Sequence, residues 1–261
     1  MSGDAPSRSE IRLIRGLRRR KEREARGLFL AEGIRVVEEL VAAGLGLRLA
    51  VVAPSARETE RGGAVVAALE ARCPVRQVSE RELIALADTE TPQGVVVVAE
   101  APRAALADVR LAGRRSMALV LDGVQDPGNV GTLTRTAEAL GAAFVAVLPG
   151  TADPWGPKAV RAAAGSAFRI PIVLVEPEAL IEWLHAKGFM VYVADASGAP
   201  AEAVGPAERA ALVVGNEGAG VRPPMRAVAD RVVSVPIRGG AESLNVAVAA
   251  GILLYLLTRR S

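Results

Sequence analysis

Three stretches of this chain combine glycines with polar side chains directly after apolar runs: DGVQDPGNVGTLTRTAEALGA (122–142), VVGNEGAGV (213–221) and VPIRGGAESLNVAVAAG (235–251). Their most reactive or polar members are Asn129, Arg135, Glu217, Ser243 and Asn245. Amide, guanidinium, carboxylate and hydroxyl groups can hold a polar ligand by hydrogen bonds and stabilise charge that develops on it. Each stretch alone could be an ordinary turn or helix cap, but three of them at expected strand ends favour a ligand site.

The residues around these side chains indicate which kind of ligand fits. Glycines allow backbone N–H and C=O groups to approach a ligand closely. The dinucleotide fingerprint G-x-G-x-x-G and the phosphate-binding G-K-[ST] are both missing from the first stretch, and no lysine follows its turn. The three stretches therefore suit a nucleoside that carries no phosphate and is bound largely through the backbone.

In their order and spacing, the three stretches resemble the motifs of the SpoU family, also called TrmH, which comprises RNA 2′-O-ribose methyltransferases. The resemblance covers residues 117–261. It implies S-adenosyl-L-methionine as methyl donor, S-adenosyl-L-homocysteine as product and no metal. It identifies Asn129, Arg135, Glu217, Ser243 and Asn245 with the catalytic positions. It places cofactor contacts, largely through backbone, at Ala194, Gly215, Val235, Ile237 and Leu244.

The same resemblance implies the fold of this region. We expect the α/β class, with a SPOUT-type parallel sheet and a deep trefoil knot near the carboxyl end, at about 210–245. The resemblance also implies a homodimer with the terminal helix in its interface. The small residues Ala247, Ala249, Ala250 and Gly251 would permit close approach there, although the core of a monomer would use them equally well.

The N-terminal part is strongly basic. Residues 8–26 contain nine Arg or Lys and three Glu, a net charge of +6, whereas the whole chain has a net charge of +3. Ile11, Ile14 and Leu17 recur at helical spacing, so one stripe of a helix can dock while basic residues cover its other faces. A solvated helix would show the same pattern, but the charge favours a surface that follows RNA phosphates. The candidate RNA contacts are Arg8, Arg12, Arg15, Arg18, Arg19, Arg20, Lys21 and Arg23.

Helices and strands are expected to alternate throughout. A helix over IRVVEELVAAG, strands at 47–54, 75–78 and 93–100, and a capping box at Ser79 predict a small α/β/α domain over 1–103, which resembles the L30e RNA-binding fold. Residues 104–116 are the expected linker. In 117–261 the pattern predicts strands at 117–122, 143–148, 170–175, 189–194, 210–214 and 231–235. Intervening helices, one opening near Gly131, and a last helix at about 243–258 would cover both faces of a parallel sheet.

Composition excludes several classes of protein. The single Cys73 rules out an internal disulfide or a multi-cysteine zinc site. The longest apolar run, 246–257, is too short to cross a bilayer, and the polar start does not resemble a signal peptide, so we expect a cytoplasmic protein.

We expect the chain to methylate RNA riboses at the 2′-OH, with 23S rRNA as substrate because the N-terminal domain resembles that of rRNA-modifying members. A tRNA 2′-O-methyltransferase and a non-catalytic RNA-binding protein of the same fold are the alternatives. A nicotinamide-nucleotide enzyme is disfavoured because its glycine fingerprint is missing. Neither DNA nor a membrane is an expected partner.

Overall fold

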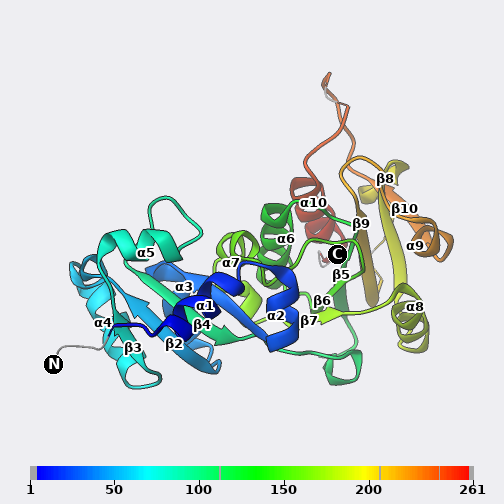
Figure 1. Ribbon diagram of the computed structural model, residues 1–261. Helices are drawn as coiled ribbons and strands as arrows, with labels where there is room; N and C mark the ends of the chain where they lie inside the picture. Colours follow the sequence, from blue (N-terminus) through cyan, green and yellow to red (C-terminus); the bar gives the residue numbers. More distant parts are fainter. Residues whose placement is uncertain (1–4, 112, 206, 241, 259–261) are drawn as a thin grey trace. The chain divides into compact units, whose positions relative to one another are not determined.

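The computed structural model describes residues 5–111, 113–205, 207–240 and 242–258. They form two compact units (Figure 1). The first contains the described residues up to Pro102 together with Trp155–Phe168, and the second contains Arg103–Pro154 and the described residues from Arg169 onward. None of the described helices is long and apolar enough to cross a membrane.

The first unit is built on a four-stranded sheet. Its order is β1 (Leu28–Glu32), β4 (Val95–Glu100), β2 (Leu47–Val52), β3 (Val75–Gln77). β4 is antiparallel to both neighbours, whereas β2 and β3 are parallel. α1 (Arg8–Gly16) and α5 (Glu80–Leu86) contribute Ile14 and Leu83 to the core on one face. α3 (Ile34–Ala42) packs against α4 (Glu60–Glu70) and β1. The capping box predicted at Ser79 is confirmed, since its hydroxyl and Glu82 exchange hydrogen bonds with the backbone.

Two features of this unit differ from the sequence-based expectation. The basic region is not one helix but two, because α1 ends at Gly16 and α2 (Arg20–Arg26) begins four residues later. β1 was not predicted, although four of its five residues are buried.

The segment 155–168 packs with the first unit although it lies far along the chain. It contains α7 (Pro157–Ala163) and a short 3-10 turn, Ser166–Phe168. The rings of Trp155 and Phe168 lie 5.1 and 5.7 Å from that of Phe29, which is fully buried. Gly165 has a φ of +91°, and a Cβ there would lie 2.6 Å from Glu39 Cβ. Only glycine therefore allows this turn to approach α3 so closely.

The second unit is built on a six-stranded sheet that is parallel throughout. Its order is β10 (Arg231–Ser234), β8 (Met190–Pro200), β9 (Arg209–Gly215), β5 (Ser116–Asp122), β6 (Phe144–Val147), β7 (Ile172–Leu174). All six strands and their parallel arrangement were predicted and are confirmed. β8 is longer than expected because it pairs with β10 a second time, at Ala199 and Pro200.

Helices cover both faces of this sheet. α6 (Pro127–Ala139) and α10 (Val246–Thr258) lie side by side on one face (Figure 1). α8 (Pro177–Ala186) and α9 (Pro223–Ala227) contribute Leu180, Leu184 and Met225 to the core on the other face. Short 3-10 turns lie at Leu106–Asp108 and Ala201–Ala203 in this unit and at Pro54–Arg57 in the first unit. The central strands β5, β6 and β9 are buried almost throughout, as expected for parallel strands that are covered on both faces.

The terminal helix α10 has two apolar faces. One packs on α6 and β9 of the same chain: Ala247 and Ala250 are buried there, and a Cβ on Gly251 would lie 3.4 Å from Thr136 Cγ2. The other face is exposed, with Val248, Ile252 and Tyr255 retaining 52, 36 and 55 % of their accessible surface.

Candidate functional site

The three polar loops meet at the carboxyl edge of the six-stranded sheet. Because the strands are parallel, the loops that follow β5, β9 and β10 all leave the sheet at this edge. α6 begins at Pro127, four residues earlier than predicted, and Asp126 caps it by accepting a hydrogen bond from Asn129 N at 3.0 Å. Asn129 therefore lies in the first helical turn, and its side chain reaches the other two loops.

One chain of hydrogen bonds joins the loops. Asn245 Nδ2 donates to Asn129 Oδ1 at 3.1 Å, and Asn129 Nδ2 donates to Glu217 Oε1 at 3.0 Å. Asn245 Oδ1 accepts from Ala247 N at 2.9 Å at the start of α10. A carboxylate only accepts, so Glu217 fixes which way both amides point. Three of the five predicted catalytic side chains are thus brought together.

Glu217 is held as an anion. Burial alone would raise its pKa, but hydrogen bonds from the Asn129 side chain and from the N–H groups of Gln125 and Asp126 outweigh this and lower the pKa. An ionised carboxylate with its lone pairs already engaged is a poor proton acceptor. Its geometry suits a residue that orients Asn129.

A pocket of about 580 Å³ opens beside this network. Its walls are the middle of β8, the loop from Gly215 to Gly220, the end of β10 with the segment after it, and the first half of α10. A Cβ on Gly215 would lie 2.2 Å from the Gly220 carbonyl carbon, so only glycine allows the loop to fold back on itself. The Asn216 and Gly220 backbones exchange two hydrogen bonds across this tight turn, 3.0 and 2.9 Å long.

All five predicted cofactor positions line this pocket: Ala194, Gly215, Val235, Ile237 and Leu244. Ser243 lines it as well, is exposed, and forms no hydrogen bond within the described residues. Arg135 does not line it. It lies six residues beyond Asn129 on α6, about 9 Å along the axis and on another face. Its side chain is exposed, without an ion pair to any residue that the structure describes.

Asp195 also lines the pocket and was not predicted. Its carboxylate accepts a hydrogen bond from Arg226 of α9 and further ones from the hydroxyl and N–H of Ser197, which lower its pKa to about 2. Its place directly after the predicted strand 189–194 is the signal that could have identified it.

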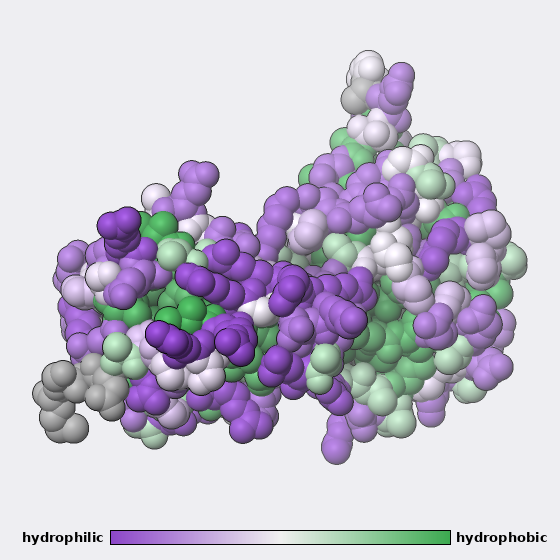
Figure 2. Space-filling model, in the orientation of Figure 1, coloured by the Kyte–Doolittle hydropathy of each residue, from purple (hydrophilic) through white to green (hydrophobic). Residues whose placement is uncertain are grey.

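The predicted RNA contacts separate into two groups. Arg8, Arg12 and Arg15 on α1 and Arg19 at the start of α2 are exposed along one groove, and they have no hydrogen bond or ion pair within the described part of the chain. Figure 2 shows this region of the first unit as mostly hydrophilic. We call these four residues the arginine stripe.

The other four predicted contacts are Arg18, Arg20, Lys21 and Arg23, and three of these side chains form hydrogen bonds or an ion pair within the protein. Lys21 is exposed. Arg18 donates to the carbonyls of Ala85 and Ala87, and Arg20 pairs with Glu24 at 2.7 Å. Arg23 is only 7 % exposed and donates to the carbonyls of Leu17 and Arg18 at 2.8 and 2.9 Å. It satisfies the end of α1, so its expected place on the RNA surface is corrected here to a structural one.

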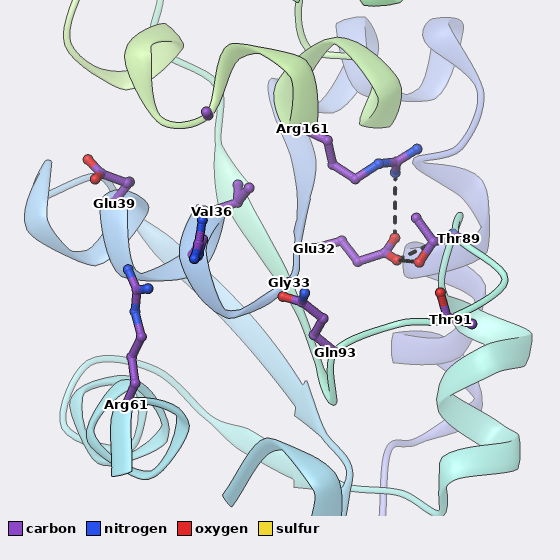
Figure 3. A pocket seen from close by; sticks show the side chains of 11 residues that line it. Glu32, Gly33, Val36, Glu39, Arg61, Thr89, Thr91, Gln93 and Arg161 are labelled. Carbon is purple, nitrogen blue, oxygen red and sulfur yellow. Dashed lines mark hydrogen bonds and ion pairs between the residues drawn. The ribbon is translucent and has the colours of Figure 1, made fainter. Parts of the chain in front are cut away.

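A second pocket, of about 590 Å³, lies within the first unit (Figure 3). Glu32 is buried at its base and accepts hydrogen bonds from Asp88 N (2.9 Å) and from Thr89. Arg161 of α7 lies 3.8 Å from Glu32 and donates to Asp88 at 2.9 Å. These bonds connect the segment 155–168 to the strand end of β1, and sequence spacing gave no sign of them.

Comparisons with known proteins match this chain to rRNA methyltransferases. The SpoU rRNA Methylase family profile matches residues 116–255, and an MRM3-like substrate binding domain profile matches residues 8–97. The chain is 39 % identical over 242 residues to the 23S rRNA (guanosine(2553)-2′-O)-methyltransferase RlmP of Bacillus subtilis, covering 92 % of each protein.

Solved structures of methyltransferases match this chain as well. The AdoMet-bound rRNA methyltransferase from Sinorhizobium meliloti superposes with a TM-score of 0.86 at 30 % identity, over 98 % of this chain and 97 % of that one. The SpoU methyltransferase AviRb from Streptomyces viridochromogenes, in complex with AdoMet, also has a TM-score of 0.86, at 28 % identity and 97 % coverage of both chains.

Proposed function

Because the chain belongs to the SpoU rRNA methylase family, we propose that it transfers the methyl group of S-adenosyl-L-methionine to a ribose 2′-OH in 23S rRNA. The observation that carries this proposal is the hydrogen-bonded set Asn129, Glu217 and Asn245, of which Glu217 and Asn245 line a nucleoside-sized pocket. Relatives named as 23S rRNA 2′-O-methyltransferases support the choice of RNA. Such a substrate places the protein in the cytoplasm.

The pocket residues fit S-adenosyl-L-methionine. A volume of about 580 Å³ is within the range of small-molecule sites. Ile237 and Leu244 are each 37 % exposed on its wall, and an adenine ring would cover them. The loop backbone from Gly215 to Gly220 offers the polar contacts. When bound, the cofactor supplies an electrophilic methyl group on its sulfonium.

The side chains around the pocket then have separate tasks. Asn129, oriented by Glu217 and Asn245, holds the ribose, and Ser243 adds a free hydroxyl on the same rim. Placement of the 2′-OH in line with the methyl group supplies a large part of the rate enhancement. A guanidinium stays protonated in proteins, so Arg135 binds the adjoining RNA phosphate and stabilises developing charge.

The first unit is proposed to bind the RNA, and the second to carry out the chemistry. The arginine stripe supports this division because its four guanidinium groups, unpaired within the described residues, follow one groove along α1 to the start of α2. Arginines arranged in this way can neutralise successive phosphates. We retain 1–103 and 117–261 as the two domains, with residues 155–168 packed on the first.

We further propose a homodimer and a trefoil knot. The exposed stripe Val248, Ile252 and Tyr255 on α10 supports a second copy of the chain as its partner. The knot would span about 210–245, where β9 runs between β8 and β5 and β10 then pairs with the far side of β8.

The test is incubation of the protein with radiolabelled S-adenosyl-L-methionine and total RNA, followed by digestion and nucleoside analysis. A 2′-O-methylated nucleotide in 23S rRNA is the expected product. Label in tRNA would select the tRNA alternative. Cofactor binding without transfer to naked RNA or assembled ribosomal subunits would contradict the enzyme, and RNA binding without cofactor binding would select the non-catalytic RNA-binding protein.

A further inference from the structure

The turn between β5 and α6 is held from one side by a buried hydroxyl. β5 lies between β6 and β9, so the loops after these strands flank the turn. Thr151, from the loop after β6, accepts a hydrogen bond from Gly123 N and donates one to the Leu121 carbonyl, both at 2.9 Å. Thr151 is 1 % exposed and Leu121 is fully buried, so water cannot replace these bonds.

The loop after β9 holds the same turn from the other side. Asn216 Nδ2 donates to the Gly123 carbonyl at 3.1 Å. The backbone N–H and the Nε of Arg222 each donate to the Asp122 carboxylate at 2.7 Å. Asp122 is fully buried, so its carboxylate oxygens rely on Arg222 for hydrogen bonds that water cannot supply. We call Asp122, Thr151, Asn216 and Arg222 the turn clamp.

The turn clamp connects the two halves of the reaction site. The turn leads directly into α6 and Asn129, and Asn216 and Arg222 flank the loop that lines the cofactor pocket. We propose that Thr151 and the Asp122–Arg222 pair are positioning residues. They hold the start of α6 in register with the cofactor loop, so that a 2′-OH held by Asn129 faces the methyl donor. This inference rests on the proposed function.

A clamp of this kind predicts a selective kinetic defect. Thr151→Val keeps the size and β-branching of the side chain and removes the hydroxyl. We expect kcat to fall at least about 10-fold, because displacement of reacting groups by 1 Å can cost about 100-fold. The KM for S-adenosyl-L-methionine and the calorimetric Kd of S-adenosyl-L-homocysteine should change less than about 3-fold, because Thr151 does not line the cofactor pocket. The tight turn Asn216–Gly220 keeps its own backbone bonds. Thr151→Ser should restore kcat to within about 3-fold.

Thr134→Val is the matched control. Thr134 is also 1 % exposed, but its hydroxyl donates only to Val130 O within α6, at 2.8 Å. Loss of this hydroxyl breaks no hydrogen bond between loops, so kcat should stay within about 2-fold of the wild-type value. An unchanged kcat in folded Thr151→Val, an equal loss in Thr134→Val, or no rescue by serine would each overturn the proposal.

Two further measurements keep the test decisive. If Thr151→Val does not fold, Arg222→Lys replaces it: this side chain is 40 % exposed, and lysine keeps the charge but lacks the Nε donor. A wild-type kcat there would overturn the proposal. Hydrogen exchange of the wild type and Thr151→Val needs no RNA. Faster exchange confined to 123–131 is expected, and unchanged exchange would refute the clamp even if the wild type methylated no RNA.

Discussion

Asn129 is the residue at which the three loops converge, and its two amide atoms are engaged differently. Its oxygen accepts from Asn245 and its nitrogen donates to Glu217. The spare hydrogen on that nitrogen and the second lone pair on that oxygen can still face a ribose. A rigid amide with one free donor and one free acceptor is a suitable reader of a 2′-OH, which is itself both donor and acceptor.

Arg135 provides the sharpest test at the level of one side chain. Arg135→Ala should lower kcat at least about 100-fold, because it removes the guanidinium proposed to hold the RNA phosphate that adjoins the reacting ribose. The Kd for S-adenosyl-L-homocysteine, measured by calorimetry, should change less than about 3-fold, since Arg135 does not line the pocket. Arg110→Ala, at another exposed arginine, is the control and should retain wild-type turnover. Wild-type turnover in Arg135→Ala would remove this residue from the mechanism.

The polar residues could be chosen from the sequence, but their contacts could not. Strand-end positions identified Asn129, Glu217 and Asn245, and the family resemblance gave them roles. Thr151 and Asp122 escaped notice because a buried hydroxyl or carboxylate has no sequence pattern of its own. Arg23 was misread for a related reason: its charge suggested RNA, whereas the break after α1 created carbonyls for it to satisfy.

Among the elements, we propose that α1 sets how tightly RNA is held. The triple variant Arg8→Ala, Arg12→Ala, Arg15→Ala should weaken RNA binding and reduce the slope of log K against log salt by about 2–3, at roughly 0.7–0.9 per phosphate released. Fluorescence anisotropy with an rRNA fragment over a salt series measures this slope. The double variant Arg20→Ala, Arg26→Ala is the control, because both side chains are paired with glutamates on α2. An unchanged slope in the triple variant would make the stripe a solvated face.

The ion pair between Asp195 of β8 and Arg226 of α9 should make the free energy of unfolding depend on pH. The pKa of Asp195 falls from 3.8 to about 2 because Arg226 and Ser197 stabilise its charged form. Its contribution to stability is therefore complete above pH 3.8 and is lost as the pH falls toward 2. Wild type should lose about 1 kcal/mol more unfolding free energy than Asp195→Asn between about pH 6 and about pH 3, after allowance for solvent screening. Urea denaturation at both pH values measures it, and parallel losses would contradict the assignment.

At the scale of the molecule, sequence periodicity predicted two α/β regions but not which segments of the chain pack in each of them. The segment 155–168 follows β6 in the chain, so its pattern reads as one more helix of the second domain. It packs instead with the first unit, through Trp155 and Phe168 on Phe29 and through Arg161 near Glu32. Such long-range pairing depends on side-chain fit between distant segments, which no local pattern encodes.

The exposed face of α10 is the proposed dimer interface. Its stripe of Val248, Ile252 and Tyr255 is apolar, although the opposite face already fills the core of the same chain. An aspartate within a dry interface would be buried without a partner, so Val248→Asp with Ile252→Asp should raise the dimer Kd at least about 30-fold, equivalent to about 2 kcal/mol. Sedimentation velocity over a concentration series measures it. Ile84→Asp, at an isoleucine of α5 that is 51 % exposed, should leave the dimer intact. A monomeric wild type at micromolar concentration, or equal dissociation in both variants, would exclude α10 as the interface. Because Asn245 directly precedes α10, separation of the copies should lower methyl transfer as well, and a fully active monomer would show that each chain carries a complete site.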